Sequence, residues 1–108
     1  MFIKKKSFVF KAKNPISSVK ENDNFIKELA ELINMKIISG PHSLYITDKG
    51  NEGVSSVCII KTSHICVHSW DKKTPGLMHV DIFSCKNFSI KKINGCQNNI
   101  WYYINNML

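Results

Sequence analysis

The chain has 108 residues, of which 44% are hydrophobic, and its formal net charge is +7. This length is enough for one domain with a single core and too short for two, so we expect residues 1–108 to form one domain. No apolar run reaches the roughly 20 residues of a membrane-spanning helix, and no apolar segment of a secretory signal follows the N-terminal lysines, so we expect no membrane association and a cytoplasmic location.

The first half of the chain predicts a strand, a helix and a second strand. Residues 7–12 have the composition of a strand. Between residues 18 and 34 the apolar side chains recur at helical spacing, which predicts a helix lying against a sheet. Residues 35–38 predict a second strand closed by the turn Ser39-Gly40-Pro41, and residues 44–46 are a candidate continuation of that strand.

The second half predicts a central strand and an antiparallel pair. Residues 54–60 form a nearly continuous apolar and β-branched run, typical of a strand covered on both faces. Residues 65–69 and 77–84 follow as two strands joined by a turn. Residues 98–104 have the apolar spacing of a short helix. The sum is an α+β fold, a two-layer sandwich of an antiparallel sheet with helices packed on one face.

Strand alternation places several reactive side chains together. His64, Cys66 and His68 share one face of their strand, because successive side chains point to opposite faces. Asp81 and Cys85 share a face of the partner strand. If these two faces coincide, His68 and Cys85 converge.

The residues alone leave two interpretations of this cluster. It can be a set of ordinary half-exposed strand residues, or a zinc site with His64, Cys66, His68 and Cys85 as ligands. The 15 basic residues also allow a nucleic-acid-binding module, although all of them are lysines and none offers the bidentate guanidinium that grips phosphates and guanine edges. Nucleic acid is therefore not the partner we expect.

The order and spacing of these residues also resemble a known family. Ser55, Ser63-His64, His68-x-Trp70 and Asp81-x-Phe83-x-Cys85 together resemble the short prokaryotic S-adenosylmethionine decarboxylases, which are self-processing pyruvoyl enzymes. The resemblance implies an enzyme of polyamine (spermidine) biosynthesis that acts on a small amino-acid-type substrate and assembles as a homodimer of processed αβ protomers. It implies no metal.

The resemblance also implies a role for each matched residue. The Ser63 hydroxyl attacks the carbonyl carbon of Thr62, Ser55 stabilises the intermediate, and His68 accepts the α-proton of residue 63. The chain then divides into a β chain (1–62) and an α chain (63–108), and Ser63 becomes a covalent pyruvoyl group. That group forms a Schiff base with the substrate and supplies an electron sink that unmodified side chains lack. Cys85 donates a proton after carbon dioxide has left.

Two lysines depart from the family pattern. Lys49 and Lys72 stand where the family usually places aromatic and acidic residues that bind the nucleoside, and lysine offers neither an aromatic face nor a hydrogen-bond acceptor. This leaves S-adenosylmethionine, the same chemistry on ornithine or arginine, and an inactive, unprocessed paralogue as alternatives. The candidate substrate-binding residues are Lys49, Glu52, Trp70, Asp71 and Lys72.

Overall fold

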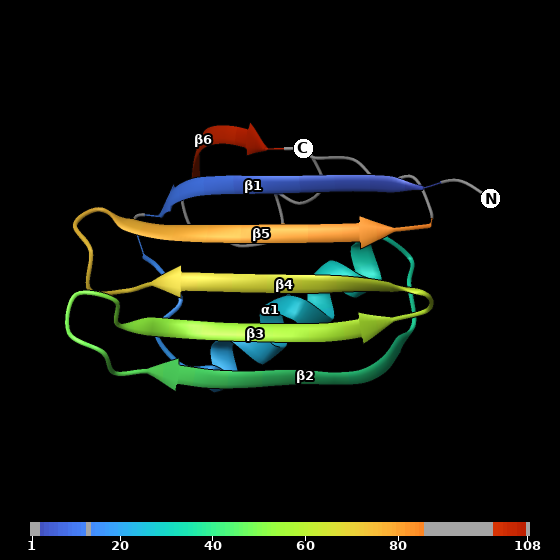
Figure 1. Cartoon of the computed structure of the whole chain (residues 1–108), viewed down its shortest axis with the longest axis horizontal. Coiled ribbons are helices and arrows are strands. Elements are labelled where there is room, and N and C mark those ends of the chain that lie inside the picture. Colours follow the sequence, from blue (N-terminus) through green and yellow to red (C-terminus); the bar gives the residue numbers. More distant parts are fainter. Residues whose placement is uncertain (1–2, 13, 86–100, 108) are drawn as a thin grey trace.

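The computed structural model describes residues 3–12, 14–85 and 101–107. They form an antiparallel six-stranded sheet, in the order β2-β3-β4-β5-β1-β6, with one helix on one face (Figure 1). The expected α+β two-layer architecture is confirmed, and it contains one helix within the described residues. The strands are β1 (Lys4–Ala12), β2 (Ile37–Ile46), β3 (Gly53–Ile60), β4 (Ser63–Trp70), β5 (Gly76–Ser84) and β6 (Trp101–Met107), and the helix is α1 (Val19–Leu32).

Helix α1 begins at a capped residue and lies across the sheet. The Ser18 side chain accepts a hydrogen bond from the backbone N–H of Glu21 (3.1 Å), which satisfies one of the unpaired donors of the first turn. The helix buries Phe25 and Leu29 against β2, β3 and β4. The buried Asn22 side chain donates a hydrogen bond to the Ser56 hydroxyl of β3. The helix is too short and too polar to cross a membrane, and the described residues contain no other.

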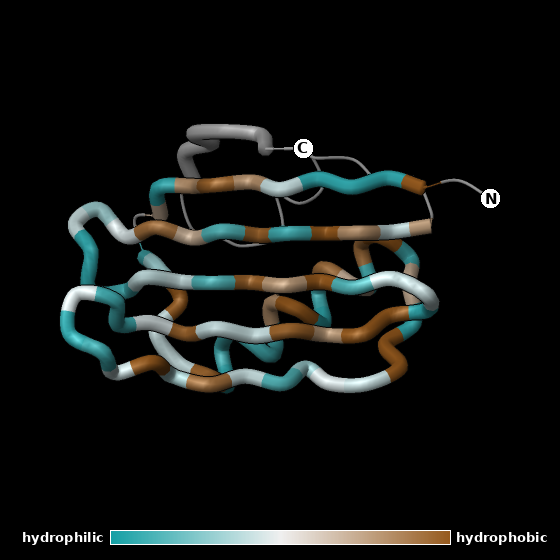
Figure 2. Tube along the Cα trace, in the orientation of Figure 1, coloured by the Kyte–Doolittle hydropathy of each residue, from teal (hydrophilic) through white to brown (hydrophobic). Residues whose placement is uncertain are grey.

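Alternation along the strands separates a core face from an open face. On β4 every second side chain is buried beneath the helix layer, starting with Ser63. The intervening side chains on β4 are only half-buried, and no element of the described residues covers them. Figure 2 shows this alternation as changes of colour along the strands. The core is made of Phe8, Phe10, Phe25, Ile26, Leu29, Ile65, Val67, Met78, Val80 and Ile82, among others.

Strand β2 differs from the sequence expectation. It is one strand that continues through Gly40-Pro41 rather than ending there, and its register with β3 shifts between Ile37 and Ser39 and again between Ser39 and His42. The strand lies at the edge of the sheet, where a proline without an N–H group removes no bond from the interior of the ladder. Gly40 adopts φ 103°, a conformation that glycine reaches without steric cost.

Two further expectations were wrong. Strand β3 is covered on one face only, since Val57 and Ile59 are 42% and 49% exposed on the open face. Residues 101–104 belong to strand β6, which pairs with β1, and not to a helix. The remainder of that predicted helix, residues 98–100, lies outside the described residues.

Candidate active site

The residues singled out in the sequence lie in two groups at opposite ends of the sheet. Thr62, Ser63 and Cys85 lie at one end, where β4 begins and β5 has just ended; we call this the cleavage end. The loops 47–52 and 71–75 lie at the other end, which we call the loop end (Figure 1). Strand β4 connects them, and its length of roughly 23 Å separates the two groups.

At the cleavage end, the Cys85 thiol lies against the bond expected to break. Residues Ile60 and Ser63 pair directly, so β3 and β4 are joined by a turn of two residues, Lys61 and Thr62. The Cys85 Sγ lies 3.5 Å from Thr62 Oγ1 and 3.6 Å from the Lys61 carbonyl oxygen. The backbone N–H of Cys85 donates to Ser63 Oγ (3.1 Å). These contacts hold the hydroxyl, the thiol and the Thr62–Ser63 peptide together.

The turn also strains the residue before Ser63. Thr62 has φ 51°, in the left-handed region. A β-branched side chain there costs about 1–2 kcal/mol, because Cβ crowds the backbone. The strain therefore lies on the residue whose carbonyl carbon is the expected point of attack.

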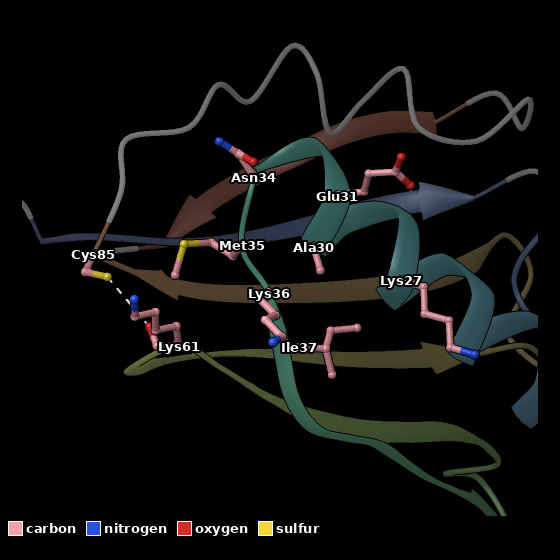
Figure 3. A pocket seen from close by; sticks show the side chains of 9 residues that line it. All are labelled: Lys27, Ala30, Glu31, Asn34, Met35, Lys36, Ile37, Lys61 and Cys85. Carbon is pink, nitrogen blue, oxygen red and sulfur yellow. Dashed lines mark hydrogen bonds between the residues drawn. The ribbon is translucent and has the colours of Figure 1, made fainter.

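A surface hollow of about 760 Å³ opens beside the cleavage end. Figure 3 shows Cys85 and Lys61 at one side of it, and the end of α1 with Glu31 and Lys27 along it. Lys36 also lines the hollow. With three lysines and one glutamate among its lining residues, the hollow favours a negatively charged group, such as a carboxylate.

Toward the loop end, Ser55 and His68 form a pair on the open face. The two residues are direct partners in the β3–β4 ladder, and His68 Nδ1 lies 2.9 Å from Ser55 Oγ. The imidazole stacks on His79, with ring centroids 6.0 Å apart, and approaches Trp70. Burial lowers the pKa of His68, nearby His79 lowers it further, and Asp81 opposes the change. The ring is therefore held in place and neutral at neutral pH, the form that accepts a proton.

Hydrogen bonds tie each loop of the loop end to a neighbouring strand. The Tyr45 hydroxyl donates to Asp71 Oδ1 (2.9 Å), and Trp70 Nε1 donates to Asn51 Oδ1 (2.8 Å). Tyr45 and Asn51 were missed in the sequence, because nothing in their spacing indicates a contact with the loop 71–75. These bonds hold Trp70 against the loop 47–52 and Asp71 against the end of β2.

The remaining predicted binding residues lie in the same two loops. Lys49 and Lys72 are exposed, one in each loop. Glu52 is half-buried, and its carboxylate accepts a hydrogen bond from the backbone N–H of Gly50 (3.0 Å). All five candidate substrate-binding residues are therefore neighbours of the loop end and remote from Ser63.

The expected convergence of His68 and Cys85 within one chain is wrong. Residue His68 pairs with His79 in the β4–β5 ladder, and Cys85 lies six residues beyond His79, roughly 20 Å away. His68 is also five residues from Ser63 on the same strand, so the two side chains point to opposite faces. A single chain thus holds Ser63 and Cys85 at one end of the sheet and the Ser55–His68 pair toward the other end.

The zinc site expected as an alternative is also not assembled. His68 is bonded to Ser55, and Cys85 lies beyond the end of β5. The group that comes together within the described residues is instead His64, Cys66 and Asp81.

The chain is similar to the members of one protein family. The profile of the S-adenosylmethionine decarboxylase family matches residues 9–96. An S-adenosylmethionine decarboxylase proenzyme of Saccharolobus islandicus is 36% identical over 72 residues, which are 67% of this chain and 53% of the relative. The proenzyme of the same name from Saccharolobus solfataricus is 36% identical over 70 residues, covering 65% of this chain and 51% of the relative. The chain thus spans about half the length of these curated relatives.

Proposed function

The chain belongs to the S-adenosylmethionine decarboxylase family, and we propose that it cleaves itself between Thr62 and Ser63 and decarboxylates S-adenosylmethionine for polyamine biosynthesis. The observation that carries this proposal is the packing of the Cys85 thiol and N–H against the strained Thr62–Ser63 turn. The Ser63 hydroxyl as nucleophile, the Cys85 thiol as proton donor and the strained Thr62–Ser63 peptide thus lie together at the cleavage end.

Processing begins with the Ser63 hydroxyl. Its oxygen attacks the carbonyl carbon of Thr62, and the C–N bond breaks as the ester C–O bond forms, which releases the strain of the turn. Removal of the α-proton of residue 63 by a neutral imidazole then expels the Thr62 carboxylate. Water converts the remaining dehydroalanine to a pyruvoyl group with loss of ammonia. His68 of a second copy, with its lowered pKa and its bond to Ser55, is the base for the α-proton.

The residues around Ser63 suit a pyruvoyl group made in place. Ser63 is 8% exposed, and its oxygen already accepts the Cys85 N–H. When formed, the group supplies the electron sink that decarboxylation requires. The Cys85 thiol then returns a proton to the substrate carbon, and the lysines of the neighbouring hollow attract the substrate carboxylate.

A dimer completes the site. Strands β2 and β3 expose apolar side chains on the open face. Leu44 is 68% exposed and Ile59 is 49% exposed. Two copies packed face to face in antiparallel orientation bury these side chains in one isologous interface. The same arrangement places the Ser55–His68 pair and the loop end of one copy near the cleavage end of the other, which a single chain does not achieve. The functional unit is a homodimer of processed protomers.

The proposal is tested by intact mass and by carbon dioxide release. We expect the purified chain to give two fragments that separate between Thr62 and Ser63, with a pyruvoyl mass at the new N-terminus, and to release labelled carbon dioxide from carboxyl-labelled S-adenosylmethionine. A full-length species that persists for days would refute the self-processing. Release from ornithine or arginine only would keep the processing and refute the substrate.

Strain at Thr62 gives a separate prediction. Thr62→Gly removes the cost of the left-handed conformation, so we expect processing to slow by about tenfold, in line with a strain of about 1–2 kcal/mol. The measurement is the rate at which freshly purified or denatured and refolded chain converts to fragments.

The matched control is Thr62→Val. It keeps the β-branch and removes the hydroxyl that touches Cys85 Sγ, so we expect a rate within a few-fold of the wild type. If Thr62→Val slows as much as Thr62→Gly, the hydroxyl contact with Cys85 and not the strain promotes cleavage.

A further inference from the structure

A second group of reactive side chains lies on the open face and takes no part in the chemistry described above. His64, Cys66 and Asp81 each offer one ligand atom, and all three atoms lie within 4.8 Å of one another. We propose that these residues bind a divalent transition metal of the zinc class. The site shares no residue with the cleavage end or with the Ser55–His68 pair, and metal binding can be measured without processing or decarboxylation.

The backbone holds the three ligands in register. Cys66 and Asp81 are direct partners in the β4–β5 ladder, and His64 is two residues from Cys66 on the same face. His64 Nε2 already lies 3.1 Å from Asp81 Oδ2. A tetrahedral ion with bonds of about 2.0–2.3 Å draws its ligands to roughly 3.5 Å from one another, so only small side-chain rotations are needed. Ligands on paired strands are held more rigidly than ligands on loops.

Neighbouring groups orient the carboxylate. The buried Ser7 hydroxyl of β1 donates a hydrogen bond to Asp81 Oδ1, which leaves Oδ2 directed toward His64. Burial raises the pKa of Asp81, but hydrogen bonds from Ser7 and His64 and the charge of Lys5 outweigh it, so the pKa lies below its usual value. The carboxylate is therefore ionised and fixed, as metal-ligating carboxylates generally are.

The donor set selects the metal. One thiolate, one imidazole and one carboxylate suit zinc or cobalt, whereas calcium and magnesium take oxygen ligands. Three protein ligands leave a fourth position for water or for another molecule.

Metal binding displaces the proton of the Cys66 thiol. Burial raises the pKa of the Cys66 thiol and nearby Asp81 raises it further, so without metal the sulfur carries its proton. Formation of the metal–sulfur bond sends that proton to the solvent.

The test is titration of the purified chain with Co²⁺ followed by absorption spectroscopy. We expect one Co²⁺ per chain, a thiolate-to-cobalt charge-transfer band in the near ultraviolet, and displacement of the band by Zn²⁺. Cys66→Ser should abolish the band. Ser7→Ala should weaken Co²⁺ binding roughly tenfold or more, the usual effect of losing a hydrogen bond to a ligand.

Two variants are matched controls. His68→Gln replaces an imidazole two residues from Cys66 on the same face, and Cys85→Ser removes another half-buried thiol. Both variants should keep the charge-transfer band. A band that survives Cys66→Ser, or the absence of saturable Co²⁺ binding by the wild type, would overturn the site. If Cys66→Ser fails to fold, as judged by circular dichroism, His64→Gln provides the same test, since loss of the imidazole should lower the affinity by at least tenfold.

Discussion

Replacing Ser63 by alanine should leave the chain intact and inactive. Without the hydroxyl there is no nucleophile to attack the Thr62 carbonyl, and without processing there is no pyruvoyl group. Intact mass should show one species of 108 residues, and carbon dioxide release should fall to the background. Any two-fragment species in this variant would contradict the proposed origin of the new N-terminus.

The control for this variant lies on the same strand and the same face. Ser69→Ala removes a buried hydroxyl that donates to the Ile16 carbonyl (2.6 Å), far from the cleavage end. It should cost about 1 kcal/mol of unfolding free energy and still be processed.

Cys85→Ala should also be processed, because the thiol is not needed to form the pyruvoyl group. It should decarboxylate slowly, because it lacks the proton donor for the later step.

Mixing two inactive variants should restore activity. A His68→Ala chain keeps Ser63 and Cys85, and a Cys85→Ala chain keeps Ser55 and His68. In a mixed antiparallel dimer one site receives both intact halves, so co-expressed and randomly paired chains should show about a quarter of the wild-type activity. Each variant alone should be nearly inactive.

The mass of each chain in the mixture makes this result specific. The His68→Ala chain should be cleaved only when its partner supplies the missing imidazole. Its Cys85→Ala partner, which faces an alanine at position 68, should stay uncleaved in the mixed dimer. Cleavage of the His68→Ala chain on its own, or no recovery of activity in the mixture, would show that the two halves do not act across a dimer.

Local sequence patterns predicted most of the fold. Period-two alternation identified β4 and β5 and the faces of their side chains, and helical spacing identified α1, because these patterns reflect burial on one face. The Gly40-Pro41 turn failed as an end of β2, since an edge strand tolerates a bulge and a missing donor. The apolar run of β3 was misinterpreted as a strand covered on both faces within one chain. Such a run does not show whether the layer over the second face comes from the same chain.

The candidate residues came from the sequence one by one, but the way the sheet distributes them did not. Ser55 and His68 were identified from the sequence, and so were Ser63 and Cys85, yet their distribution over two ends of the sheet depends on register. Register fixes which residues are partners across β4 and β5, and it paired His68 with His79. The zinc ligands considered in the sequence do not come together for the same reason, because register makes Asp81 and not Cys85 the ladder partner of Cys66.

The two interruptions in β2 bear on how copies of this chain can associate. A regular edge strand offers a row of free N–H and C=O groups, and another chain can extend the sheet there without limit. Pro41 removes one donor from that row, and the register shifts at Ile37/Ser39 and Ser39/His42 break its spacing. Growth into ribbons is thus discouraged at this edge, while the open face remains available. An edge built in this way opposes the association of copies into fibres.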